Sequence, residues 1–283
     1  MVDLLTRMAR ASERRAVRAR TEENESALRR RALDTPPPPA LALDPRGFDL
    51  FAEIKRRSPS AGALSRADTP WGPEDLTRQA RAYADARVAA ISVLTESEEF
   101  SGSLSDLTIV AAEVGTPVMR KDFLVDPYQL LEARAAGAAG ALLILRLVDA
   151  SRLRELLDAA DEMGLFVLLE AFDRDDLDRA REIKDGARLE TSRVLIGLNC
   201  RDLKSLRVDL SRFPDLRDAF PAGVTAVAES GMETPDDVAS VARSGYAAAL
   251  VGSVLMRAAD PAELAALMIQ AGRREAERRC VSG

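Results

Sequence analysis

Eight short apolar runs, each followed by a segment of helical composition, constrain the fold of this chain more than any other feature. Each run begins far enough after the previous one to leave room for a loop, a helix and a return loop. Eight such units predict an α/β fold of the (β/α)8 TIM barrel type, and the count disfavours an open doubly wound sheet, the structural rival. The runs are Leu50–Lys55, Ala89–Thr95, Pro117–Lys121, Gly140–Leu145, Leu165–Glu170, Val194–Asn199, Thr225–Ser230 and Ala248–Gly252.

The first 47 residues have a different character from the rest. They begin with a charged stretch that lacks Pro and Gly up to about residue 33, which predicts one or two helices. Thr35-Pro36-Pro37-Pro38-Pro39 then predicts a stiff linker. We therefore expect an N-terminal helical extension with a Pro-rich linker over 1–47, a catalytic barrel over 48–270 and a charged tail over 271–283.

Composition excludes several classes of function. The formal net charge of -6 argues against nucleic acid as a partner, because that binding needs clustered Lys and Arg. No stretch of uncharged apolar residues is long enough for a membrane span, and Arg7 and Arg10 interrupt any apolar leader. The two cysteines, Cys200 and Cys280, have no metal-like spacing and indicate a reducing, cytoplasmic location.

Histidine is absent from the chain. Acid–base chemistry near neutral pH must then come from Lys, Glu or Asp, and no His-ligated metal site is possible. A lysine beside other cations or apolar walls has a lowered pKa and can deliver a proton, so we expect such a lysine here.

Polar residues gather where the apolar runs end, which in a barrel is a single face. For any one of them a salt-bridged rim residue is the more probable interpretation, but several on one rim indicate a catalytic site. Glu53, Lys55, Lys121 and Glu170 would form a proton-transfer set, with a Schiff-base lysine as the competing role for either lysine. The polar residues at the run ends are Glu53, Lys55, Lys121, Glu170, Asn199, Arg201 and Glu229.

Small residues after three of the runs indicate a phosphate site. Ser230-Gly231 follows the seventh run, Gly252-Ser253 the eighth, and Ser58-Pro59-Ser60 the first. Such residues let backbone N–H groups and hydroxyls approach an anion, although a single loop of this kind is more often just a tight turn.

Long ordered motifs make residues 48–262 resemble the indole-3-glycerol phosphate synthase family. They include Ala52-Glu53-Ile54-Lys55-Arg56-Arg57-Ser58-Pro59-Ser60, Arg120-Lys121-Asp122-Phe123, Ile196-Gly197-Leu198-Asn199-Cys200-Arg201-Asp202-Leu203 and Ala228-Glu229-Ser230-Gly231. The resemblance implies ring closure of 1-(2-carboxyphenylamino)-1-deoxyribulose 5-phosphate, with loss of CO2 and water. It also implies a small phosphorylated substrate, no metal and no organic cofactor.

The resemblance further implies a role for each rim residue. Lys121 would be the general acid of ring closure, and Glu170 and Lys55 would move protons in the dehydration. Glu53 would hold Lys55, Asn199 and Arg201 would bind the anthranilate end, and Glu229 would contact sugar hydroxyls or neighbouring groups. Phe100 and Phe123 would wall the aromatic pocket. The phosphate would be held by Ser58, Ser230, Gly231, Gly252 and Ser253, with Arg57 and Leu250 beside them.

The chain departs from the family pattern at three places. Ala171-Phe172 stands where many members have Val-His, Cys200 where Asn or Ser is common, and Arg87-Val88 where a Gly is usual. These departures leave room for a divergent paralogue of a specialised indole pathway. A barrel like that of phosphoribosylanthranilate isomerase and a non-catalytic phosphosugar-binding barrel are two further hypotheses. A monomer or weak homodimer is expected.

Overall fold

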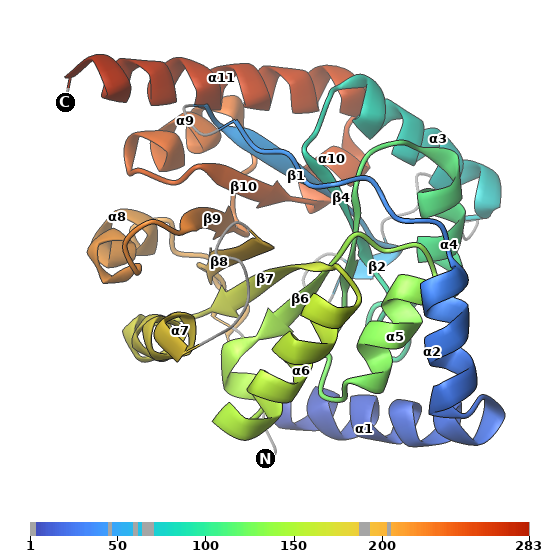
Figure 1. Ribbon diagram of the computed structural model, residues 1–283. Helices are drawn as coiled ribbons and strands as arrows, with labels where there is room; N and C mark the ends of the chain where they lie inside the picture. The colour runs from blue at the N-terminus through green and yellow to red at the C-terminus, as the bar shows by residue number, and fades with distance from the viewer. Residues whose placement is uncertain are drawn as a thin grey trace.

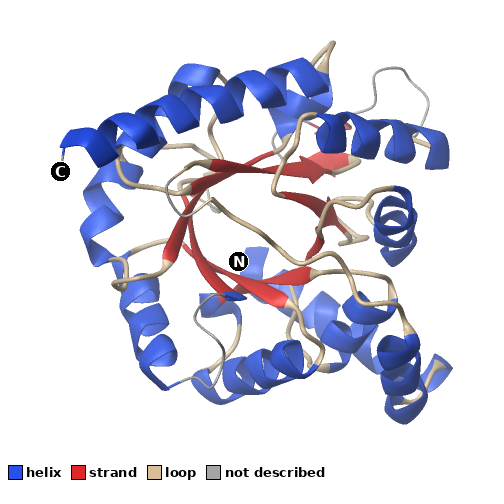
Figure 2. Ribbon diagram, turned by 45° about the horizontal axis from the view of Figure 1, so that its top comes forward, coloured by secondary structure: helices blue, strands red, loops and turns tan. Residues whose placement is uncertain are grey.

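A computed structural model of the chain confirms the TIM barrel and the helical extension. It describes residues 4–44, 47–58, 62–63, 71–186, 193–202 and 205–282. Eight parallel strands close into a barrel in the order β1-β10-β9-β8-β7-β6-β5-β4, and β4 pairs back onto β1. Figure 2 shows this ring of strands inside a ring of helices. The barrel strands are β1 (Asp49–Ile54), β4 (Ala90–Leu94), β5 (Val118–Lys121), β6 (Gly140–Ile144), β7 (Phe166–Ala171), β8 (Val194–Asn199), β9 (Thr225–Glu229) and β10 (Ala248–Val251).

Helices fill the connections, and a short antiparallel pair, β2 (Arg57–Ser58) with β3 (Gly62–Ala63), follows the first strand. Two helices precede the barrel, α1 (Leu4–Glu22) and α2 (Glu25–Asp34). The others are α3 (Pro73–Asp85), α4 (Leu104–Glu113), α5 (Tyr128–Ala135), η1 (Leu145–Leu147), α6 (Ala150–Glu162), α7 (Arg174–Gly186), α8 (Arg212–Leu216), η3 (Arg217–Ala219), α9 (Pro235–Arg243), α10 (Ser253–Arg257) and α11 (Pro261–Ser282). The helix α11 is continuous across residue 270, where the sequence suggested that a charged tail begins.

The strands are apolar on both faces because both faces are buried. Inward residues such as Phe51, Met119 and Leu168 form one cluster inside the barrel. Outward residues such as Leu50 and Val118 join a second cluster between strands and helices. This double burial is why the sequence displays continuous apolar runs rather than alternation.

The N-terminal extension contacts the barrel interior at both ends. Leu41 and Leu43, in the linker that leads into β1, pack against the interior cluster. Leu4 and Leu5 of α1 pack against the same cluster, and Leu4 also lines a cavity in the barrel. In Figure 1, α1 runs along the lower edge of the barrel and α11 along the upper edge.

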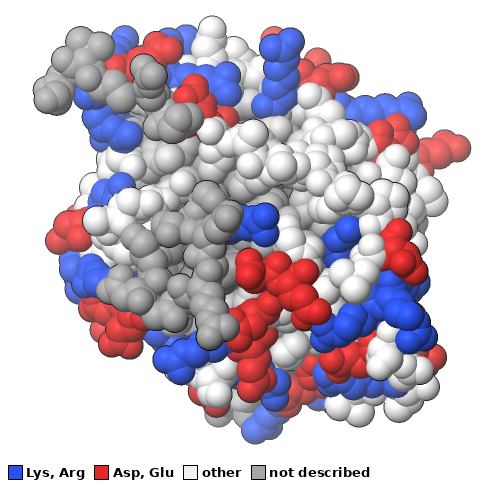
Figure 3. All heavy atoms as spheres, in the orientation of Figure 1, with Lys and Arg blue, Asp and Glu red and all other residues white. Residues whose placement is uncertain are grey.

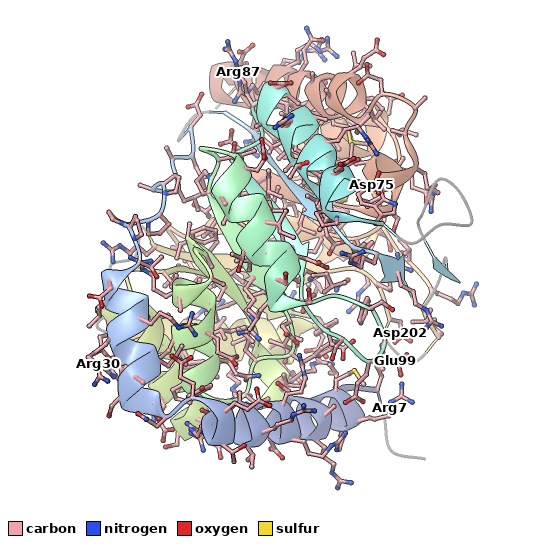
Figure 4. All side chains as sticks on the ribbon, turned by 90° about the vertical axis from the view of Figure 1, so that its right-hand side faces the viewer. Arg7, Arg30, Asp75, Arg87, Glu99 and Asp202 are labelled. Carbon is pink, nitrogen blue, oxygen red and sulfur yellow. The ribbon has the colours of Figure 1, made fainter. Side chains whose placement is uncertain are left out.

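The departure from the family pattern at Arg87 lies at a helix-to-strand turn. Gly137, Gly164 and Gly245 precede three other strands with left-handed φ values of 91°, 67° and 94°. Arg87 holds the same place after α3, at the end labelled in Figure 4, with φ of 58°. A residue with a Cβ in this conformation costs about 1 kcal/mol, so the arginine is tolerated at a small loss of stability.

None of the helices in the described part of the chain is long and apolar enough to cross a membrane. On the face drawn in Figure 3, acidic and basic side chains lie side by side around the edge of the molecule.

Candidate active site

A cavity of about 550 Å³ opens at the carboxyl ends of the barrel strands. It brings together nearly all the side chains that the sequence indicated, from six strands, the loops that follow them and the loop after β4. These residues are Glu53, Lys55, Phe100, Lys121, Phe123, Glu170, Asn199, Arg201, Glu229, Ser230, Gly231, Leu250, Gly252 and Ser253.

One of the indicated residues is not brought to this cavity, and another lies outside the described residues. Arg57 lies in β2, is exposed and is not among the residues that line the cavity. Ser58 follows it in β2, but its side chain lies outside the described residues, as do Pro59 and Ser60. The contribution of the first loop to phosphate binding therefore stays a prediction.

Glu53 and Lys55 project together from the end of β1, as expected for residues two apart on a strand. The Lys55 ammonium donates a hydrogen bond to Glu53 Oε2. Burial alone would raise the pKa of Glu53, but the ammonium groups of Lys55 and Lys121 outweigh it and lower the pKa. A Cβ at Gly252 would lie 2.2 Å from Glu53 Oε2 and 3.0 Å from Lys55 Nζ. The glycine thus leaves the space that this ion pair occupies.

Lys121 lies between two carboxyl groups on the cavity floor. Its Nζ is 3.6 Å from Glu229 Oε2 and 3.8 Å from Glu170 Oε1. Burial on its own would lower the pKa of Lys121, but the charges of Glu170, Glu229 and Glu53 outweigh it and raise the pKa. The expectation of a lowered lysine pKa is therefore wrong for Lys121, because its neighbours are carboxylates rather than cations.

Glu229 is buried without hydrogen-bond donors. Neither carboxyl oxygen has a hydrogen-bond partner among the described residues, and the residue is 1% exposed. Burial, together with the charge of Glu170, raises the pKa of Glu229 to about 8. A Cβ at Gly197 would lie 1.9 Å from Glu229 Oε1, so only glycine at that position leaves room for the carboxyl group.

Asn199 fixes the orientation of Glu170. The Asn199 side-chain amide donates to Glu170 Oε1 at 2.6 Å, and the Arg201 backbone N–H donates to Asn199 Oδ1 at 2.9 Å. The second bond makes the amide present its nitrogen, rather than its oxygen, to the carboxylate. The Arg201 guanidinium itself donates to the carbonyl of Leu206 at 3.0 Å.

One side of the cavity is apolar and aromatic. The rings of Phe100 and Phe123 lie 6.2 Å apart between centroids. The sequence predictions missed Leu142, Ile144 and Phe172, which also line this side. Leu142 and Ile144 are two apart on β6, and that spacing from the carboxyl end of the run was a usable signal. Phe172 could be placed only with the fold, where the Arg146 guanidinium stacks on it at 4.9 Å from the ring centroid.

The other side of the cavity is formed by two loops of small residues. Ser230 and Gly231 follow β9 with left-handed φ values of 72° and 82°. A Cβ at Gly231 would lie 2.5 Å from the Val208 side chain, so glycine is needed there for space as well as for conformation. Gly252 and Ser253 begin α10 after β10.

No group of three or more Asp, Glu, Cys or His side chains within the described ranges is arranged to hold a metal ion. The charged side chains that line the cavity are instead Glu53, Asp122, Glu170, Glu229 and Glu233, together with Lys55, Lys121, Arg201 and Arg257.

Comparison with known proteins identifies the family. A family model described as indole-3-glycerol phosphate synthase matches residues 6–267. The chain belongs to the indole-3-glycerol phosphate synthase family. The synthase of Parafrankia sp. (strain EAN1pec) is 42% identical over 266 residues, which cover 93% of each chain. That of Nocardioides sp. (strain ATCC BAA-499 / JS614) is 43% identical over 252 residues, covering 87% of this chain and 92% of the relative.

The match to the indole-3-glycerol phosphate synthase family extends beyond the barrel. It begins at residue 6, inside α1, where the sequence motifs were weak. Among solved structures, 3-hexulose-6-phosphate synthase from Salmonella typhimurium is similar with a TM-score of 0.63 at 15% identity. That likeness covers 81% of this chain and 100% of the other, and it shows the fold alone.

Proposed function

We propose that the chain catalyses the reaction of its family, the closure of 1-(2-carboxyphenylamino)-1-deoxyribulose 5-phosphate to indole-3-glycerol phosphate. The observation that carries the proposal is the position of Lys121, 3.8 Å and 3.6 Å from two carboxyl groups on the floor of a cavity with one aromatic and one small-residue side. The substrate has a matching order of parts, with an aromatic acid at one end, a ketone in the middle and a phosphate at the other end.

The cavity orients this substrate through its two sides. The aromatic ring lies against Phe100 and Phe123, with the ring carboxylate towards Arg201. The phosphate lies at the loops of Ser230 and Ser253, where small residues allow close approach of backbone N–H groups. The ketone then falls between the two ends, above Lys121.

Lys121 donates a proton to the ketone oxygen while the ring carbon that bears the carboxylate attacks the carbonyl carbon. Its raised pKa keeps the ammonium group charged at neutral pH, which is the form that a general acid needs. Transfer is still favourable, because the oxygen that develops in the transition state is a far stronger base than an amine. Loss of CO2 then restores the aromatic ring.

Dehydration completes the reaction by removing the new hydroxyl group and a proton from the carbon next to nitrogen. The Lys55 ammonium protonates the departing hydroxyl, and the Glu170 carboxylate, held by Asn199, accepts the carbon-bound proton. Glu53 holds Lys55 in place. Each of the three side chains thus has one task in this step.

Glu229 adjusts the charge of the cavity. With its pKa raised to about 8, the carboxyl group can take up a proton near neutral pH, which removes one of the negative charges beside Lys121. A protonated Glu229 makes the cavity less negative, which favours a substrate that carries a carboxylate and a phosphate.

The test is turnover of the carboxyphenylamino substrate by the purified chain, followed by indole fluorescence. The Lys121→Ala variant should lose about a hundredfold or more in kcat, as expected when a general acid is removed. Arg78→Ala, on the exposed face of α3, is the control and should retain the parent rate. An inactive parent chain would defeat the proposed function, and a fully active Lys121→Ala variant would defeat the role of Lys121.

A further inference from the structure

The helix α1 binds the loop that follows Lys121 through several side chains. Arg15 donates to both oxygens of Asp122, at 2.7 and 3.0 Å. Arg20 donates to both oxygens of Asp126, each at 2.7 Å. Ser12, which is buried, accepts a hydrogen bond of 2.8 Å from the Gln129 side chain. The extension is therefore attached to the start of α5 and to the segment between β5 and α5, which begins next to the proposed general acid.

Only the first of these contacts reaches a residue of the cavity. Asp122 lines the cavity between Lys121 and Phe123, and its side chain is 0% exposed. Besides Arg15, its carboxylate accepts hydrogen bonds from the Phe123 backbone N–H at 2.8 Å and from the Thr95 hydroxyl at 2.7 Å. The Thr95 backbone N–H in turn donates to the Lys121 carbonyl at 2.9 Å. Asp122 thereby fixes the backbone on both sides of itself.

Arg120 also pairs with Asp122, at 3.2 Å, but it has other partners. Its guanidinium donates to the Gln129 carbonyl at 2.7 Å and to Glu132 at 3.1 Å. Without Arg15, one guanidinium would serve two carboxylates in a buried site. Removing one partner of a buried ion pair leaves an uncompensated charge, and the remaining groups rearrange or change protonation to relieve it.

We propose that Arg15 is a positioning residue for Lys121 and Phe123, acting through Asp122. The inference rests on the proposed function, because it assigns Arg15 to the same reaction. Arg15 neutralises and orients the buried Asp122 carboxylate, and this contact keeps the carboxyl end of β5 in one conformation. Displacement of a catalytic group by about 1 Å can reduce the rate about a hundredfold. The N-terminal extension thus completes the aromatic and acid side of the active site.

Two more ion pairs align α1 with the neighbouring loop that carries Phe100. Arg7 pairs with Glu99 at 2.7 Å, and Arg14 lies 3.5 Å from Glu98. Figure 4 shows Arg7 pointing from the end of α1 towards Glu99. These pairs are largely exposed and so contribute little stability themselves. They set the direction of the helix, while Arg15 makes the contact that reaches the cavity.

The test compares Arg15→Gln with the matched control Arg20→Gln. Each variant removes a two-point contact between α1 and the same loop, but only Arg15 touches a cavity residue. Steady-state kinetics and thermal unfolding are measured for both. We expect Arg15→Gln to lose at least about tenfold in kcat with a smaller change in KM, and Arg20→Gln to stay within about twofold of the parent in kcat.

A second substitution separates positioning from a general weakening of the fold. Adding Asp122→Asn to Arg15→Gln removes the buried charge that Arg15 no longer neutralises and keeps an acceptor for the Phe123 N–H. The double variant should recover part of the kcat that Arg15→Gln loses. Equal kcat losses in Arg15→Gln and Arg20→Gln, or parent-like kcat in Arg15→Gln, would overturn the inference while the parent turns over substrate. An inactive parent would instead defeat the proposed function and this inference with it.

Discussion

Two buried carboxyl groups of this barrel, those of Asp122 and Glu229, have opposite surroundings. Asp122 is 2% exposed and accepts hydrogen bonds from two guanidinium groups, a hydroxyl and a backbone N–H. Although burial opposes ionisation, Arg120 and Arg15 lower its pKa to about 2. Glu229 is 1% exposed, has no hydrogen-bond donor within the described residues, and burial raises its pKa to about 8.

The difference shows what distinguishes a carboxylate that stabilises the fold from a carboxyl group that can exchange a proton. Both groups are buried, so their neighbours decide the charge state: two guanidinium groups lower the pKa of Asp122, and the like charge of Glu170 helps to raise that of Glu229. A fully paired carboxylate stabilises its surroundings and resists protonation. A carboxyl group left without donors is poised to exchange a proton near neutral pH, at a cost in stability that the rest of the barrel must offset.

The largest effect should come from removing the hydrogen-bonded carboxylate of Asp122. Asp122→Ala leaves two guanidinium groups without their buried acceptor and should lower the free energy of unfolding by about 3–5 kcal/mol. Asp218→Ala, which removes an exposed partner of Arg174, is the control and should cost less than about 1 kcal/mol. Urea denaturation measures both, and similar losses would show that the Asp122 network does not stabilise the fold.

The contribution of Asp122 to the stability of the fold should decrease at acidic pH. Because the folded pKa of Asp122 is lowered to about 2, its stabilising contribution is present above the unfolded value of 3.8. The contribution is lost as the pH falls towards 2. The parent should therefore lose its advantage over Asp122→Asn across that acidic window. Denaturation at several acidic pH values measures this, and a constant difference in stability would contradict the assignment.

A smaller effect is expected from crowding Glu229, whose carboxyl oxygens have no hydrogen-bond donor among the described residues. Gly197→Ala places a Cβ 1.9 Å from Glu229 Oε1 and should cost about 1–3 kcal/mol through overpacking. Gly115→Ala is the matched control, since a Cβ there meets no atom within 4 Å and the backbone is not left-handed. The thermal unfolding midpoint should be lowered only by Gly197→Ala, and equal behaviour would mean that Glu229 can move aside freely.

The effect of removing the ionisable group of Glu229 should depend on pH. Because the folded pKa of Glu229 is raised from 4.5 to about 8, the stability that it permits is complete below pH 4.5 and is lost as the pH rises through 8. Glu229→Gln carries no such charge, so its stability relative to the parent should rise as the pH increases from about 4.5 to about 8.5. Denaturation at the two pH values measures the gain, and no pH dependence would argue against a raised pKa.

The residues at the rim of the active site were predictable from the sequence, because they end the apolar runs and the two-residue period of a strand tells which side chains share a side. Glu53 and Lys55 follow an apolar run with the spacing that puts both on one side, and Lys121, Glu170 and Glu229 end other runs. The charge states were not predictable in the same way. A lysine with a lowered pKa was expected, but the pKa of Lys121 is raised by neighbouring carboxylates, because those neighbours come from β7 and β9.

By itself, the sequence determined the closed barrel, the order of its units, the side chains at its rim and the presence of a helical extension. These features depend on the spacing of apolar and polar residues along the chain, which is already present in the sequence before any tertiary contact forms. Only the tertiary structure decided that Arg15 reaches Asp122, that Glu229 lacks donors among the described residues, and that Gly197 and Gly252 leave space for buried carboxyl groups. Those properties belong to pairs of residues far apart in the chain, and long-range packing sets their distances and their dielectric surroundings.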